Sequence, residues 1–135
     1  MRSVLSPVLQ AASFGDAAVS PTVARYCEQM IHDTPITTMV GFLHALGVHN
    51  ETGGLPVLAK VPTLVACGSA DNLTTPEHSE EMAAALPRAE LVVVGGAGHL
   101  VQLEQPDPVN AALVRLVERS TPNKLVAMAR RLRGG

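Results

Sequence analysis

Two side chains that can perform acid–base chemistry, Asp71 and His99, each follow a short apolar run of β-prone residues. The stretch between them is long enough for a helix that connects two parallel strands. In a parallel α/β sheet, groups just past the carboxyl ends of neighbouring strands lie close together. A carboxylate there can accept the Nδ1–H of an imidazole and support the imidazolium that forms when Nε2 takes a proton. The pair therefore predicts the acid–base half of a nucleophilic catalytic site.

The elements that would position this pair alternate between strand and helix. The pattern predicts a strand over 61–67, a polar loop over 68–75, a helix that begins at Thr75-Pro76 and stops at Pro87, a strand over 91–94, a loop of small residues over 95–98, and a helix capped by Asp107-Pro108. Such a βαβα unit indicates an α/β fold with two parallel strands. Because both strands are apolar along their length, we expect helices to cover both faces of the sheet.

The residues before this unit predict short amphipathic helices. Ser20-Pro21 and Thr34-Pro35 each place a capping hydroxyl before a proline at the first helical position. Apolar residues then recur at helical spacing, at Val23, Tyr26/Cys27 and Met30/Ile31, and again at Ile36, Met39/Val40, Leu43 and Leu46. We expect residues 1–15 to be weakly helical, Gly47 to close the second helix, and residues 50–54 to form a loop.

The composition of the 135 residues excludes several classes of protein. The chain has 10 Lys and Arg against 12 Asp and Glu, so it offers no basic field for nucleic acid. Hydrophobic residues make up 47% and charged residues 16%, which excludes a disordered chain. No apolar run approaches the roughly 20 residues that a membrane span needs.

Cys27 and Cys67 indicate reduced, buried thiols, and Pro7, Gln10 and Asp16 interrupt any signal-peptide core, so we expect a cytoplasmic protein.

Motifs around the two candidate residues resemble those of the α/β-hydrolases. Residues 61–71 (VPTLVACGSAD), followed by Thr75-Pro-Glu77, resemble the strand and acid-bearing loop of that family. Residues 95–106 (GGAGHLVQLEQP), followed by Val109-Asn110, resemble its histidine loop and last helix. The resemblance implies a partial α/β-hydrolase fold. In it, residues 1–54 form a helical cap-like segment, residues 55–120 the C-terminal core segment, and residues 121–135 a basic tail.

The resemblance also implies a reaction, the hydrolysis of an ester or related acyl bond in a small hydrophobic substrate. Asp71 would be the triad acid and His99 the base, with no cofactor and no metal. The family's serine stands on a Gly-x-Ser-x-Gly turn that precedes the acid in the sequence. No serine of this chain has glycine at both −2 and +2. We therefore expect the chain to begin after the nucleophile and to be inactive alone.

Two other functions stay open at this point. The chain can be a truncated remnant or interaction module that keeps the acid and base without catalysis. It can also be a Rossmann-like nucleotide binder, because glycines at 95–98 follow a strand, although the third glycine of G-x-G-x-x-G is missing.

Several smaller features indicate structure rather than chemistry. His44 and His49 are five residues apart, not the four of a helical ligand pair, so they predict surface histidines. Ser69, close to Asp71 in the polar loop, is predicted to form hydrogen bonds within the loop rather than to act as a nucleophile. Two strands are too few for an independently stable sheet, and the mean hydropathy is +0.22. We therefore expect self-association through an exposed strand edge.

Overall fold

The computed structural model describes residues 13–16 and 19–121 of the chain. Their elements are α2 (Pro21–His32), α3 (Ile36–Val48), the 3₁₀-helix η1 (Thr52–Leu58), β1 (Thr63–Gly68), α4 (Pro76–Ala84), β2 (Ala89–Val94), α5 (Val101–Glu104) and α6 (Pro106–Ser120). None of these helices is both long and apolar enough to cross a membrane. The expected helix over 1–15 and the basic tail lie almost wholly outside the described residues.

The sheet is the parallel pair that the sequence predicts. β1 and β2 lie in register from Thr63 opposite Ala89 to Gly68 opposite Val94. The pairing continues one step past the strands, where the Ser69 N–H donates to the Val94 carbonyl oxygen at 2.9 Å. Both strands therefore end at the same level, which places the two loops that follow them side by side.

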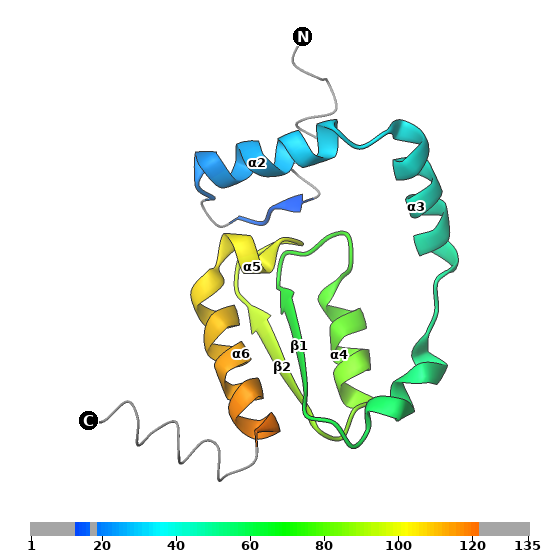
Figure 1. Cartoon of the computed structure of the whole chain (residues 1–135), viewed down its shortest axis with the longest axis vertical. Coiled ribbons are helices and arrows are strands. Elements are labelled where there is room, and N and C mark those ends of the chain that lie inside the picture. The colour runs from blue at the N-terminus through cyan, green and yellow to red at the C-terminus, as the bar shows by residue number, and fades with distance from the viewer. Residues whose placement is uncertain (1–12, 17–18, 122–135) are drawn as a thin grey trace, which may run out of the picture.

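Helices α4 and α6 pack against opposite sides of the sheet (Figure 1). The core under α5 and α6 consists of Val94, Ala97, Val101 and Val109, with Val92 packed against it. Side chains alternate along a strand, so Leu91 and Val93 lie on the face away from this core. They are 36% and 43% exposed. The prediction that helices lie on both faces of the sheet is therefore correct. The prediction that these helices cover β2 completely is wrong, because Leu91 and Val93 stay partly exposed.

The two predicted N-terminal caps have different outcomes. The Ser20 hydroxyl oxygen accepts the Thr22 N–H at 3.3 Å, so α2 begins as predicted. The cap predicted at Thr34 is wrong: Pro35 precedes the first turn of α3, which has no side-chain cap. The Thr34 hydroxyl donates instead to the Met30 carbonyl oxygen at 2.9 Å. Its side chain is thus used by the end of α2 and not by the start of α3.

The apolar faces predicted for these helices are mostly not buried. Cys27 is the one buried residue of α2, and α3 has none in the described structure. In α3 the side chains of Phe42 and Val48 are 76% and 75% exposed. On α6, Val109 and Ala112 are buried, whereas Val117 is 62% exposed. Helical spacing predicts a helix through local bonds, but burial also needs a partner element, which the sequence pattern does not specify.

Several element boundaries also differ from the predictions. Residues 50–54 were expected as a loop, but η1 begins at Thr52, whose N–H donates to the Asn50 side chain at 3.1 Å. α6 begins at Pro106 rather than at the predicted Asp107-Pro108, because a proline at the first position needs no N–H partner. The short helix α5 was not predicted, α3 ends at Val48, one residue beyond Gly47, and α4 ends before Pro87. The expected domain boundary between residues 54 and 55 falls inside η1 and stays a prediction.

Candidate functional site

The side chains of Asp71 and His99 meet at the carboxyl ends of the two strands. Asp71 follows β1 and His99 follows β2, and Asp71 Oδ2 lies 3.0 Å from His99 Nδ1. The Asp71 side chain is 5% exposed, whereas the His99 side chain is 34% exposed. A carboxylate in this position keeps the imidazole proton on Nδ1 and leaves the Nε2 lone pair for a reactant. The structure therefore brings together the two residues selected from the sequence.

Asp71 is held by the turn in which it lies. Its Oδ1 accepts the backbone N–H groups of Leu73 and Thr74, each at 2.9 Å, in the pattern of an Asx turn. Burial pushes the pKa of Asp71 upward, but the hydrogen bonds from the Thr74 N–H, His99 and the Leu73 N–H outweigh it. The net pKa lies below the ordinary value of an aspartate. At neutral pH, Asp71 is therefore a carboxylate that can accept the His99 proton.

Thr74 is the third side chain of this site, and it was not among the residues predicted from the sequence. Its hydroxyl donates to Asp71 Oδ2 at 2.9 Å, and its oxygen lies 3.2 Å from His99 Nδ1. The Nδ1–H group of His99 thus has two oxygen atoms within reach, one from each residue. The sequence does carry a signal for Thr74, namely its position three residues after Asp71. A threonine at this spacing can donate its backbone N–H and its hydroxyl to the aspartate carboxylate.

Backbone contacts join the acid loop to the histidine loop. The Ala70 N–H donates to the Ala97 carbonyl oxygen at 2.9 Å, and the Gly96 N–H donates to Ser69 Oγ at 2.8 Å. The prediction that Ser69 is a loop hydrogen-bonding residue is confirmed. Gly96 has a φ of 74°, the left-handed conformation that glycine adopts most readily. The two loops therefore form one unit, and the distance between Asp71 and His99 depends on it.

The histidine loop has no free run of N–H groups for a phosphate. The Gly96 N–H is bonded to Ser69, the Ala97 N–H to the Val94 carbonyl oxygen at 3.4 Å, and the Gly98 N–H to the Glu104 carboxylate at 2.9 Å. A buried carboxylate at this place also repels an anion. These contacts count against the nucleotide-binding alternative.

The structure shows no cluster of metal ligands in the part of the chain that it describes. No group of three or more His, Cys, Asp or Glu side chains there is arranged to hold a metal ion. His44 and His49, which the sequence places five residues apart, are both exposed.

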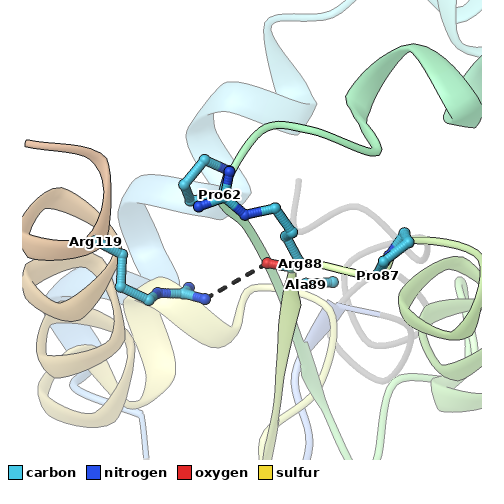
Figure 2. A pocket seen from close by; sticks show the side chains of 5 residues that line it. All are labelled: Pro62, Pro87, Arg88, Ala89 and Arg119. Carbon is cyan, nitrogen blue, oxygen red and sulfur yellow. Dashed lines mark hydrogen bonds between the residues drawn. The ribbon is translucent and has the colours of Figure 1, made fainter.

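A pocket lies at the opposite end of the sheet from Asp71 and His99. It is lined by Pro62, Pro87, Arg88, Ala89 and Arg119, at the amino ends of the strands (Figure 2). Arg119 donates to the Arg88 carbonyl oxygen at 3.5 Å and forms an ion pair with Glu90 at 3.0 Å. This arginine holds α6 against β2, and the full length of the strands separates the pocket from the candidate site.

Comparison with known sequences links the chain to a family. The sequence model of the alpha/beta hydrolase fold matches residues 5–106. BpoC of Mycobacterium tuberculosis, named as a non-heme bromoperoxidase, is 33% identical over 103 residues, which are 74% of this chain and 37% of BpoC. The polyketide synthase ThaQ of Burkholderia thailandensis is 33% identical over 81 residues, which are 60% of this chain and 4% of ThaQ. The chain thus spans well under half the length of these relatives.

Two solved structures are also similar. A serine hydrolase involved in carbazole degradation, the CarC enzyme, matches with a TM-score of 0.64 and 18% identity over 84% of this chain and 46% of the other. An esterase from Thermogutta terrifontis, solved with malate bound, is 39% identical over 52% of this chain and 26% of the other, with a TM-score of 0.48. The first likeness shows a shared fold.

Proposed function

The chain belongs to the α/β-hydrolase fold family and carries part of that fold, and we propose that it supplies the acid–base pair of a serine-type acyl hydrolase. In this proposal Asp71 is the triad acid and His99 the base. The observation that carries it is the 3.0 Å hydrogen bond between Asp71 Oδ2 and His99 Nδ1, formed between two loops that follow neighbouring parallel strands. The lowered pKa of Asp71 supports the same roles, because the acid must stay ionised while it holds the imidazole.

The reaction then proceeds by two acyl transfers. His99 Nε2 takes the proton of a serine hydroxyl as the serine oxygen attacks the substrate carbonyl carbon. Asp71 stabilises the resulting imidazolium through the Nδ1–H group. The protonated Nε2 then gives its proton to the leaving alkoxide. The alcohol departs, and the acyl group remains on the serine as an ester. Nε2 next takes a proton from a water molecule as its oxygen attacks the acyl carbon, and then returns that proton to the serine oxygen as the carboxylic acid leaves, which restores the serine and the neutral imidazole.

We infer that this serine comes from polypeptide outside the 135 residues. None of the serines in the chain stands in a Gly-x-Ser-x-Gly sequence. The Ser69 hydroxyl, which is close to Asp71 in sequence, accepts the Gly96 N–H at 2.8 Å. Its role in joining the two loops argues against its use as the nucleophile.

The proposed substrate is a small hydrophobic ester. Helix α2 lies at the end of the molecule toward which both strands point, the end that carries Asp71 and His99 (Figure 1). Its apolar side chains Tyr26 and Met30 are 64% and 57% exposed. These residues support a cap role for the segment up to residue 54, since an apolar cap favours an apolar acyl group.

A hybrid enzyme tests the proposal. The chain replaces the structurally equivalent part of the carbazole-degradation serine hydrolase, which provides the rest of the fold and is named as a serine enzyme. A fluorophosphonate probe, which labels activated serines, should label the hybrid and should fail to label a His99→Ala hybrid. The 135-residue chain alone should stay unlabelled. Stoichiometric labelling of the isolated chain that disappears in Ser69→Ala would contradict the proposal, as would equal labelling of the two hybrids.

An interaction module is the second candidate function, and the exposed apolar residues favour it. α3 has no buried residue, and Ile36, Val40 and Leu43 are 62%, 59% and 61% exposed. Each strand of the described sheet also has only one neighbour, so each leaves one edge unpaired. We propose that the chain self-associates through such an edge. Sedimentation velocity should show dimers or larger species that grow with concentration, and a monomer at every concentration would contradict this.

The two cysteines support a cytoplasmic location. Cys27 and Cys67 are both free and buried, as expected for thiols in a reducing compartment. Thiol titration of protein purified without reductant should find two free thiols after unfolding, and a disulfide between them would contradict this location.

A further inference from the structure

Glu104, the last residue of α5, is a buried carboxylate that the proposed reaction does not use. It is 9% exposed, and it takes part in none of the ion pairs found among residues 13–16 and 19–121. Its partners are backbone N–H groups instead. Gly98 N lies 2.9 Å from Oε1 and 3.0 Å from Oε2, and Gly15 N lies 2.8 Å from Oε2. A carboxylate is buried at a large desolvation cost, so these bonds are what make its position stable.

These bonds fix the backbone immediately before His99. Gly98 is the preceding residue, and its N–H is held by both carboxylate oxygens. On the other side of His99, the Leu100 N–H donates to the Ser13 carbonyl oxygen at 3.2 Å. The residues on both sides of the imidazole are therefore anchored, one by Glu104 and one by the segment of residues 13–16.

The same carboxylate joins that N-terminal segment to the histidine loop. A Cβ atom on Gly98 would lie 2.6 Å from the Phe14 carbonyl carbon, and one on Gly15 would lie 2.6 Å from Gly98 N. Two glycines thus allow the two backbones to touch. Glu104 accepts an N–H from each backbone at this contact, so it holds both chains at once.

We propose that Glu104 is a positioning residue for His99. Its carboxylate fixes the Gly98 backbone, and this keeps His99 Nδ1 within hydrogen-bond distance of Asp71. The meaning of this role for catalysis rests on the proposed function above, but the positioning itself can be measured without turnover. Glu104 belongs to residues 95–106, the segment that resembles the histidine loop of the α/β-hydrolases, and its contacts give this glutamate a physical role there.

The test substitution is Glu104→Gln, with Glu80→Gln on α4 as the matched control. Glutamine has nearly the same size, but one acceptor oxygen becomes an NH₂ donor that faces N–H donors. Oε2 accepts the N–H groups of both Gly15 and Gly98, so an amide oxygen at that place can still accept both. The NH₂ group at the place of Oε1 then faces the Gly98 N–H, and the negative charge that strengthens both bonds is lost. Glu80 is exposed, so its substitution removes the same charge without touching the histidine loop.

The experiment measures amide hydrogen exchange and the His99 tautomer by NMR on the full 135-residue chain. In Glu104→Gln, exchange at Gly98 and Gly15 should become faster by about tenfold or more, the equivalent of one charge-assisted hydrogen bond. Exchange in β1 and β2 should change by less than about threefold. The ¹⁵N spectrum of the ring should shift from the Nδ1–H tautomer toward a mixture of tautomers. Glu80→Gln should show none of these changes.

Two results would overturn the proposal. One is wild-type exchange at Gly98 together with a wild-type His99 spectrum in Glu104→Gln. The other is faster exchange to the same degree throughout β1 and β2, which would show a role in overall stability alone. If Glu104→Gln does not fold, Glu104→Asp is measured in its place, with the same criteria and a smaller expected change, because the shorter acid keeps the charge.

Failure of the proposed function has a different signature. A hybrid enzyme whose hydrolysis does not depend on His99 would overturn the acid–base roles, while the exchange rates of Gly98 and Gly15 would still report whether Glu104 holds the loop.

Discussion

Replacement of Asp71 by asparagine removes the negative charge of the acid and keeps a side chain of nearly the same shape. The side-chain oxygen of asparagine can still accept the N–H groups of Leu73 and Thr74, which bond Oδ1 in the native chain. The new NH₂ group stands where Oδ2 accepts the Thr74 hydroxyl and the His99 Nδ1–H. A donor at that place favours the tautomer with the proton on Nε2. His99 then has no lone pair on Nε2 with which to accept a proton.

The size of the effect follows from the number of bonds to the carboxylate. The Asp71 side chain accepts four hydrogen bonds and is 5% exposed. A hydrogen bond to a charged group contributes about 1.5–3 kcal/mol, against about 0.5–1.5 kcal/mol for a neutral one. A loss of about 1 kcal/mol per bond, partly offset by repacking, gives roughly 2–4 kcal/mol less stability. In the hybrid enzyme, the wrong tautomer should lower kcat by about 10⁴-fold.

Two assays measure the loss of stability and the change of tautomer. Urea unfolding followed by circular dichroism gives the free energy of unfolding of Asp71→Asn and of the native chain. The ¹⁵N chemical shifts of the His99 ring give its tautomer. The reasoning is refuted if Asp71→Asn keeps the Nδ1–H tautomer, or if its free energy of unfolding equals that of the native chain.

Three further predictions concern the same loops. Gly68→Ala should destabilise the chain by about 1–3 kcal/mol in urea unfolding, because the added Cβ would lie 2.5 Å from the Ala97 carbonyl carbon. Gly41→Ala, in an open position of α3, is its control and should be neutral or stabilising by up to about 1 kcal/mol; equal losses would contradict the packing. Gly96→Ala should cost about 1–2 kcal/mol, since its φ is 74°, and a neutral result would exclude that conformation. Because the pKa of Asp71 is lowered on folding, its contribution to stability is present above about pH 5 and is lost as the pH falls through the folded-state pKa. Acid unfolding of Asp71→Asn should therefore be less steep than that of the native chain, and an identical acid transition would contradict this linkage.

The sequence predicted the parallel sheet and the proximity of Asp71 and His99 because both follow from the order of apolar runs and polar loops. Two apolar runs with a helix between them allow few arrangements other than a parallel pair. Once the strands are parallel and in register, Asp71 and His99 must lie at the same edge. The spacing of chemistry-bearing residues was therefore enough to place the candidate site.

Contacts between distant segments were outside the reach of that reasoning. Nothing in the pattern of residues 13–16 indicates that Gly15 lies against Gly98, or that both N–H groups meet Glu104. Thr74 is a different case, because its spacing of three residues from Asp71 was visible in the sequence, but its second contact, with His99, joins two loops that only the fold brings together. The exposure of the apolar residues of α3 was not predicted, because helical periodicity predicts an apolar face without saying what covers it.

The steady-state rate of ester hydrolysis by the hybrid enzyme tests the central claim most directly. The substrate is p-nitrophenyl butyrate, a small apolar ester, and kcat/KM is compared between the hybrid and its His99→Ala variant, both checked for folding by circular dichroism. We predict a loss of about 10²–10⁴-fold or more in His99→Ala, the range expected for removal of a general base. Equal values of kcat/KM in two folded hybrids would contradict the account, because His99 would then take no part in the reaction.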